Sequence, residues 1–297
     1  MNMPEIFGID VAKWNGTIDW SKVNTSFAIC KITKKDNSIE DSFERNYQGA
    51  TAANIAVGGY RYVYAKNVTE ALKEARGIAD ACRGKSLPMG IWLDMEDKSI
   101  KSLGKAKLTE IIRVEANALR DCGYNVGIYC NKDWFYNVLD GEYLSKEFSF
   151  WIARYPIIDN GKYNASSKLN PKSYAKAWQY SSKGKVNGIS GNVDMDVFFG
   201  EIALTQQTGC PFQEPSAAVT SDANAKKYGI KNYYSRGAFV GWTQWHLQRL
   251  GYNIGKYGID QKCGESTVTA IKQFQKDHGL LSDGISGQHT REALKEV

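Results

Sequence analysis

Two acidic residues that could do chemistry stand at the end of one apolar run. Residues 90–96 read Gly-Ile-Trp-Leu-Asp-Met-Glu, so a stretch typical of a buried strand ends in Asp94 and Glu96. Side chains two residues apart on a strand face the same side, about 6.5 to 7 Å apart along its axis. The spacing therefore predicts that both carboxyl groups project from one face.

Two further apolar runs also contain acids. Residues 7–11 (FGIDV) hold Asp10, and residues 193–198 (VDMDVF) hold Asp194 and Asp196. Taken singly, each acid could equally be a turn cap or a salt-bridge partner. The same feature in three runs favours a shared site where the strand ends meet.

Converging carboxyl groups suit the hydrolysis of glycosidic bonds. That reaction needs a protonated carboxylic acid beside the leaving oxygen and negative charge to stabilise an oxocarbenium-like transition state. Crowding and partial burial keep one group protonated, because they disfavour a further ionisation. The chemistry requires no cofactor, and none is expected.

The distribution of histidine excludes several other classes of hydrolase. The chain has only His246, His278 and His289, all beyond residue 230. A Ser-His-Asp or Cys-His site, or a His-ligated zinc site, therefore cannot lie in the first 230 residues. The spacing of the three histidines does not suit a metal either, so no metal site is expected.

Aromatic residues on the predicted strands could bind a sugar, because the CH faces of sugars stack on aromatic rings. Alternating aromatics are equally common in strands that only form a core. The candidates for substrate binding are Tyr60, Tyr62, Trp151, Tyr155 and Trp178, with Tyr64 and Tyr180 in the same alternating patterns.

The elements that would position these residues are eight β-rich runs. Helix-like segments separate the first five, as at 107–122, and helical periodicity fades after about residue 130. The pattern predicts an α/β fold, a TIM-like barrel whose last helices are missing; a three-layer open sheet is the alternative. The predicted strands are 5–11, 27–33, 57–64, 89–95, 125–129, 150–155, 177–180 and 193–198.

The C-terminal part differs in composition. Residues 205–235 are rich in Gln, Thr, Ser, Ala and Lys and contain two prolines, which indicates a linker. The remaining segment repeats itself after 23 residues, which predicts a small helical domain of two turn-helix units, each with a threonine that could cap a helix. The repeated residues are Asp260, Gly264, Thr267 and Ala270, then Asp283, Gly287, Thr290 and Ala293.

Composition limits the partners. The chain has 297 residues, 42% of them hydrophobic, with a mean hydropathy of −0.44, and no apolar run approaches the roughly 18 residues of a membrane-spanning helix, so no membrane insertion is expected. Residues 226–297 carry 11 Lys/Arg against 6 Asp/Glu within a total net charge of +6. These basic residues are scattered and lack an Arg-rich run, so nucleic acid is not an expected partner. Six cysteines without a CxxC pair indicate reduced thiols.

Four ordered motifs, FGIDV, WLDME, WQY and VDMD, resemble those of glycoside hydrolase family 25, the Chalaropsis-type lysozymes. The resemblance covers residue 5 to about 200 and implies a (β/α)5(β)3 barrel that cleaves the β-1,4 bond between N-acetylmuramic acid and N-acetylglucosamine in peptidoglycan. It implies that Glu96 is the general acid and Asp94 its partner, flanked by Asp10 and Asp194. Asp196 stands where the family often has Asn, and is assigned to substrate binding.

The resemblance also implies a mechanism with retention of configuration. The 2-acetamido oxygen of the substrate would attack the anomeric carbon while Asp94 orients it. A carboxylate nucleophile is the alternative, and the sequence leaves both open.

Residues 239–293 resemble the peptidoglycan-binding type 1 domain, a three-helix module whose net positive charge suits an anionic cell wall. The implied organisation is a catalytic domain at 1–205, a linker at 206–235 and a binding domain at 236–297. The start MNMPEIFGID has neither a basic nor an apolar signal region, so no secretory signal is expected.

Together these features resemble a bacteriophage endolysin, made in the host cytoplasm and released to the wall through a holin. A bacterial autolysin secreted by a non-classical route has the same appearance. Two other functions are possible. One is an inactive wall-binding protein. The other is a different glycosidase acting on N-acetylglucosamine glycans, although the chitinase pattern DxxDxDxE would need Asp where Met89 and Trp92 stand.

Overall fold

The computed structural model describes residues 4–200, 237–255 and 257–296. The chain divides into two compact units, the first built from Met1–Arg120 and Tyr124–Gln206 and the second mainly from Gln207–Val297. The linker expected at 206–235 lies outside the described residues.

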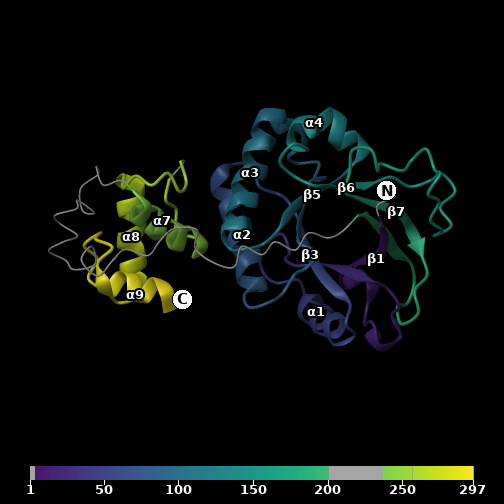
Figure 1. Ribbon diagram of the computed structural model, residues 1–297, viewed down its shortest axis with the longest axis horizontal. Helices are drawn as coiled ribbons and strands as arrows, with labels where there is room; N and C mark the ends of the chain where they lie inside the picture. The colour runs from purple at the N-terminus through teal and green to yellow at the C-terminus, as the bar shows by residue number, and fades with distance from the viewer. Residues whose placement is uncertain (1–3, 201–236, 256, 297) are drawn as a thin grey trace. The chain divides into compact units, whose positions relative to one another are not determined.

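Eight strands close into a barrel in chain order in the first unit (Figure 1). Each falls on a predicted run, so the predicted strands are confirmed. The open sheet is excluded, because the first strand pairs with the last. The strands are β1 (Glu5–Val11), β2 (Phe27–Lys31), β3 (Ala56–Tyr62), β4 (Ile91–Asp94), β5 (Val126–Asn131), β6 (Phe150–Ala153), β7 (Ala177–Gly184) and β8 (Val193–Phe199).

The direction of the last strand matters most for the site. Strands β1 to β7 are parallel to their neighbours, whereas β8 runs antiparallel to both β7 and β1. The start of β8 therefore lies at the barrel end where the other strands finish. Asp10, near the end of β1, stands opposite Asp194 at the start of β8.

Helices cover part of the outside of the barrel (Figure 1). They are α1 (Phe43–Ala52), α2 (Val68–Cys82), α3 (Lys105–Asp121) and the short α4 (Gly141–Leu144), with a π-helical turn η4 at Trp134–Val138. In the described part of the chain no helix follows β6 within the barrel unit, in agreement with the predicted loss of the last helices.

The first connection departs from the expectation of a helix between each of the first five strands. Between β1 and β2 the described residues contain only two 3-10 turns, η1 (Lys13–Asn15) and η2 (Trp20–Lys22). Gly16, which lies between η1 and η2, has φ +66°, which breaks any helix there. A third 3-10 turn, η3 (Lys101–Leu103), precedes α3.

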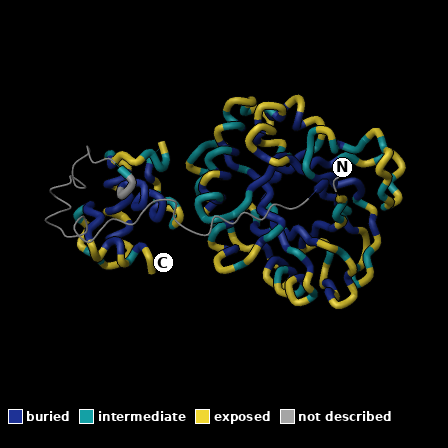
Figure 2. Tube along the Cα trace, in the orientation of Figure 1, coloured by how far each residue is buried: buried dark blue, intermediate teal, exposed yellow. Residues whose placement is uncertain are grey.

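The barrel interior is apolar at one end and polar at the other. Aromatic and aliphatic side chains from the starts of β2, β4 and β6 and the end of β8 fill one end, among them Phe27, Trp92, Trp151 and Phe198. Gly8 makes room for this filling, because a Cβ there would lie 2.3 Å from the Phe27 ring. A second, larger apolar layer lies between the strands and the helices, and the strands are accordingly buried in Figure 2.

The second unit contains helices α7 (Ala238–Arg249), α8 (Glu265–Asp277) and α9 (Gln288–Glu296). They enclose their own core, which includes Trp242, Ile271 and Phe274. None of the helices among the described residues is both long and apolar enough to cross a bilayer.

The 23-residue repeat corresponds to a repeated hydrogen-bond pattern. Nε2 of Gln244 in α7 donates to Asp260 Oδ1 (2.9 Å), the Lys262 carbonyl (3.1 Å) and the Thr267 hydroxyl (3.0 Å). Nε2 of Gln275 in α8 makes the same three bonds in the second copy, to Asp283, Ile285 and Thr290.

The threonines do not cap helices as expected. Gly264 is the N-cap of α8, and Thr267 lies inside the first turn. The threonine hydroxyls instead accept from the glutamine of the preceding helix, so each copy is held by one buried amide.

Candidate active site

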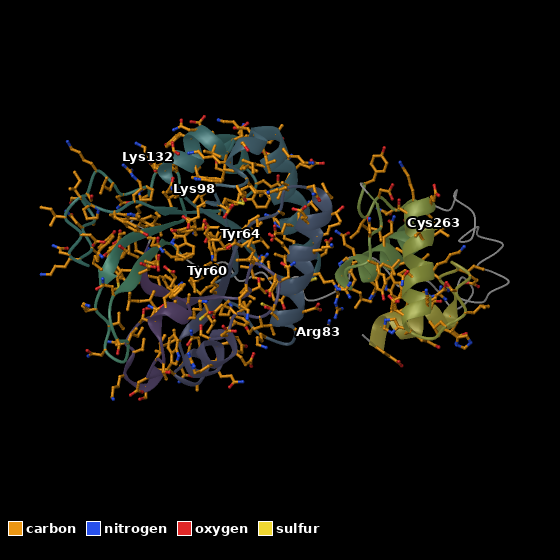
Figure 3. The ribbon with its side chains drawn as sticks, turned by 180° about the vertical axis from the view of Figure 1, so that it is seen from behind. Tyr60, Tyr64, Arg83, Lys98, Lys132 and Cys263 are labelled. Atoms are coloured by element: carbon orange, nitrogen blue, oxygen red, sulfur yellow. The ribbon has the colours of Figure 1, made fainter. Side chains whose placement is uncertain are left out.

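A polar cavity of about 340 Å³ opens at the barrel end where β1 to β7 finish. Figure 3 labels Tyr60 and Tyr64, which mark β3 and the chain just beyond it. The structure brings four of the expected acids and four of the expected aromatics together there. The cavity is lined by Asp10, Lys31, Tyr60, Tyr62, Asp94, Glu96, Tyr129, Trp151, Tyr155, Gln179, Ser182 and Asp194.

Strand geometry explains the acid pair. Asp94 is the last residue of β4, and Glu96 follows it by two positions, so both side chains point into the barrel mouth. Met95 between them is fully buried in the outer apolar layer. The alternation read from the sequence thus places both carboxyl groups in one cavity.

The acids in the cavity hold their protons more tightly than free carboxyl groups. Burial is the largest cause that raises the pKa of Glu96, and the charge of Asp194 adds to it. Burial also raises the pKa of Asp94, helped by the charge of Glu96. Burial and the charge of Asp159 raise the pKa of Asp194 to about 6. The cavity therefore retains protonated carboxyl groups closer to neutral pH than free acids would.

Lys31 is a cavity residue that sequence reasoning missed. It is the last residue of β2, and its Nζ lies 5.8 Å and 5.7 Å from the ring centroids of Tyr60 and Tyr62. Its charge lowers the pKa of Asp94 and Glu96 against the effect of burial. Its position at the end of an apolar strand, like that of the acids, was the available signal.

Gln179 is a second residue without an assigned role in the sequence, although it stands in the WQY motif. Its Nε2 donates to Asp10 Oδ2 at 2.6 Å, and its Oε1 accepts from the hydroxyls of Tyr129 (2.7 Å) and Tyr155. The amide therefore links β1, β5 and the chain after β6 at the floor of the cavity.

Two expected substrate-binding residues do not line the cavity. Trp178 neighbours Gln179 on β7 and so points to the opposite face, where its Nε1 donates to the Arg154 carbonyl (2.9 Å) and its ring contacts Tyr163. Asp196 is completely buried below the cavity. The sequence expectation is corrected for both, because neither can contact a substrate in this cavity.

No group of three or more His, Cys, Asp or Glu side chains among the described residues has the arrangement of a metal site. Cys30, Cys82 and Cys130 are buried thiols of the barrel, and Cys210 lies outside the described residues.

An eight-stranded barrel with clustered carboxyl groups at its mouth is the arrangement expected of a glycoside hydrolase with a TIM-like barrel. Residues 9–189 match the family model "Glycosyl hydrolases family 25", and residues 236–294 match "Putative peptidoglycan binding domain". The chain belongs to glycosyl hydrolase family 25 and carries a C-terminal peptidoglycan-binding domain.

Two of the curated proteins that this chain resembles are lysozymes. The autolytic lysozyme of Clostridium acetobutylicum is 27% identical over 98% of this chain and 79% of its own length. Lysozyme M1 of Streptomyces globisporus is 30% identical over 66% of this chain and 68% of its own length.

Solved structures share the fold. The Streptomyces coelicolor lysozyme has a TM-score of 0.53 and 25% identity, covering 69% of this chain and 98% of that one. The catalytic domain of the endolysin ply40 from Listeria monocytogenes bacteriophage P40 has a TM-score of 0.55 and 23% identity, covering 67% and 95%. The chain is thus a lysozyme-type glycoside hydrolase that acts on peptidoglycan.

Proposed function

We propose that this muramidase is of the endolysin type and hydrolyses the β-1,4 bond between N-acetylmuramic acid and N-acetylglucosamine, with Glu96 as general acid. The observation that carries the assignment is the pair formed by Asp94 and Glu96 in one cavity, where burial raises the pKa of Glu96. A carboxyl group with a raised pKa keeps its proton to higher pH than a free acid and can give it to the leaving oxygen.

The proposed reaction proceeds with retention and with help from the substrate. Glu96 protonates the glycosidic oxygen while the 2-acetamido oxygen attacks the anomeric carbon. Water then attacks that carbon, Glu96 takes its proton, and the acetamido group is released. Asp94 orients the acetamido group and stabilises its developing positive charge.

The surroundings of Asp94 support this role. Its Oδ1 is buried and receives no hydrogen bond within the described residues. Positive charge that develops on the substrate would supply the missing partner. A carboxylate nucleophile remains the alternative to the acetamido oxygen.

The remaining cavity residues would hold the sugar. We assign Tyr60, Tyr62 and Tyr155 to substrate contact because they line the cavity, with Trp151 at its floor. Asp10 and Asp194 would supply flanking negative charge for the oxocarbenium-like transition state.

We propose that the chain divides its functions at the boundaries expected from the sequence. We assign catalysis to residues 1–205, linkage to 206–235 and wall binding to 236–297. We propose an endolysin role with holin-dependent release. The ply40 domain, named an endolysin, shares the fold, whereas the autolytic relative favours the autolysin alternative.

The first test is a digest of purified peptidoglycan. New reducing ends, identified after borohydride reduction, should be muramitol for the wild type. Glu96→Gln should lower their rate of formation by about 10²- to 10⁴-fold, because it removes the general acid. Glu142→Gln is the matched control, because Glu142 is exposed on α4 and is not among the charges that act on Glu96.

Each other outcome has a definite meaning. Glucosaminitol would make the protein a glucosaminidase. Full activity of Glu96→Gln would remove Glu96 as the acid, and no new ends from any variant would leave only wall binding. Competitive inhibition by a thiazoline analogue of the sugar, which mimics the bicyclic intermediate, would support acetamido attack over a carboxylate nucleophile.

A further inference from the structure

Asp196 is the most deeply placed acid of the barrel mouth. It is completely buried, on β8 directly opposite Gln179 of β7. Its Oδ1 accepts from Trp151 Nε1 at 2.9 Å. Its Oδ2 is also buried, yet no N–H or hydroxyl of the described residues donates to it. The group that Asp196 does meet is another carboxyl, that of Asp10.

Asp10 is surrounded differently. Its Oδ2 accepts from Gln179 Nε2 at 2.6 Å. The hydrogen bonds fix the orientation of the Gln179 side-chain amide. A flipped amide would place its oxygen against a carboxyl oxygen of Asp10, and Oε1 would no longer accept from the hydroxyls of Tyr129 and Tyr155. Asp10 therefore has a donor directed at it and lines the cavity, where substrate and water can reach it.

We propose that Asp10 and Asp196 share a single proton, which resides on Asp196, so that the neutral Asp196 donates a hydrogen bond to an ionised Asp10. Two ionised carboxyl groups in contact in a dry site repel each other strongly, and such pairs keep one proton between them. Placing the proton on Asp196 gives its orphaned oxygen a partner. Placing it on Asp10 would put the charge on the fully buried Asp196, with the Trp151 indole and the Asp10 hydroxyl as its donors, and would leave the Gln179 amide donating to a neutral acid.

The electrostatics agree with this assignment. Burial raises the pKa of Asp196, and the charges of Asp10 and Asp194 raise it further. Burial and the charge of Asp194 also raise the pKa of Asp10, but the hydrogen bonds from Gln179 and from Asp196 lower it. The bond between the two carboxyl groups thus favours the neutral form of Asp196 and the ionised form of Asp10.

The pair titrates as a unit within a ring of other groups. Charges or polar groups act on it from every strand of the barrel. The titratable groups are Cys30 of β2, Tyr60 of β3, Asp94 and the following Glu96 of β4, Tyr129 of β5, Tyr155 after β6, Tyr180 of β7 and Asp194 of β8. Lys31 at the end of β2 lines the same cavity and acts on Asp94 and Glu96.

The inferred consequence for catalysis rests on the proposed function. Asp196 acts through Asp10, so it is a positioning residue. Its proton ensures that Asp10 and Asp196 together carry only one negative charge, on Asp10 at the floor of the cavity. Its hydrogen bond fixes the orientation of the Asp10 carboxylate.

The test is Asp196→Asn. An asparagine can present its oxygen to the Trp151 indole and its N–H to Asp10, and so reproduces a permanently protonated aspartic acid. The variant should fold and keep most of the wild-type kcat/KM on soluble glycan at acidic pH. Asp196→Ala leaves the indole and Asp10 without this partner, and should lower both kcat/KM and the melting temperature at every pH.

Melting temperature against pH is the decisive readout. A raised pKa in the folded state stabilises the wild type below the unfolded pKa of about 4, and this contribution is lost as pH rises. The asparagine side chain does not titrate. The melting temperature of Asp196→Asn should therefore increase relative to that of the wild type from about pH 4 to pH 8.

Asp133→Asn is a control with the opposite pH dependence. Hydrogen bonds from Asn137 and Lys101 lower the pKa of the exposed Asp133, which is not among the charges that act on the pair. The difference in melting temperature between Asp133→Asn and wild type should therefore move against the variant as pH rises toward the unfolded pKa of about 4, and stay constant from there to pH 8. A constant difference for Asp196→Asn across the range would overturn the proposal.

The wild type provides a measurement that does not depend on any variant folding. In ¹³C NMR at pH 7, Cγ of Asp196 should have the chemical shift of a protonated carboxyl group and Cγ of Asp10 that of an ionised one. Two ionised shifts, or the reverse assignment, would refute the proposal. Both this and the melting experiment remain valid if the wild type proves inactive as a muramidase.

Discussion

Glu96 experiences two opposing influences at the mouth of the barrel. Burial raises its pKa, whereas the ammonium group of Lys31 lowers it. Lys31 acts on Asp94 in the same sense. The balance matters because a general acid must be protonated at the working pH and still release its proton in the transition state.

Replacing Lys31 by methionine should shift this balance. Without the positive charge the pKa of Glu96 rises, so the acid stays protonated to higher pH. We expect the alkaline limb of the kcat/KM profile on soluble glycan to move upward by as much as about 1 pH unit.

Lys35→Met is the matched control. Lys35 lies 4.8 Å from the ring centroid of Tyr64 and is not among the charges that act on Glu96. An alkaline limb that stays in place in Lys31→Met, or moves equally in both variants, would contradict the assigned role of Lys31.

At the scale of elements, a buried ion pair ties α2 to the end of β3. Nη2 of the fully buried Arg61 lies 3.0 Å from Glu74 Oε1, and Glu74 also accepts from the Tyr64 amide. This anchor fixes the chain that carries Tyr62 into the cavity. Removing either partner would leave an uncompensated buried charge.

Glu115 of α3 faces the same pair but is poorly accommodated. It is fully buried, and neither of its carboxyl oxygens has a hydrogen bond among the described residues. Burial is the main cause that raises its pKa, and the charge of Glu74 adds to it. One arginine thus serves two carboxyl groups, and Glu115 is expected to be neutral.

Glu115→Met should therefore stabilise the barrel by about 1 to 3 kcal/mol, because it removes an unsatisfied buried polar group. A raised folded pKa means that the wild type loses stability as pH rises above about 4, so the gain should grow toward neutral pH. The midpoint of the barrel transition in calorimetry of the full chain measures it.

An exposed position on the same helix is the control for Glu115→Met. Glu110 is half-exposed and pairs with Lys107 at 2.7 Å, so Glu110→Met should change stability by no more than about 0.5 kcal/mol. A lower melting temperature for Glu115→Met would show that the Glu115 carboxyl group stabilises the fold through Arg61 and Glu74.

At the scale of the whole molecule, the two units have separate apolar cores, and our proposal assigns catalysis to the first and attachment to the second. Linking a binding module to an enzyme raises the local concentration of its polymeric substrate without new contacts at the active site. The net positive charge of residues 226–297 suits an anionic wall.

Deletion of residues 206–297 should separate these two contributions. Adsorption to insoluble peptidoglycan, measured by sedimentation, should weaken by about 10²-fold or more because avidity is lost. Cleavage of soluble glycan fragments should persist with similar kcat/KM. If soluble cleavage disappeared as well, the C-terminal unit would be part of the catalytic unit.

The sequence by itself determined the eight strands, the acids at their ends and the small repeated helical unit. These features follow from short-range periodicity and composition, which neighbouring residues express directly. The alternation at Asp94 and Glu96 is the clearest case, because a strand forces residues two apart onto one face. The 23-residue repeat was likewise visible in the amino-acid sequence, but the hydrogen bonds made by its threonines were not.

Only the tertiary structure decided which of these residues meet. Asp194 stands at the start of its strand and reaches the cavity because β8 runs antiparallel between β7 and β1. The same closure buries Asp196 below the cavity, turns Trp178 outward and brings Lys31 and Gln179 to the acids. The direction of a strand, the burial of its side chains and the side of the barrel to which they point depend on pairing between distant segments. Local periodicity does not encode that pairing.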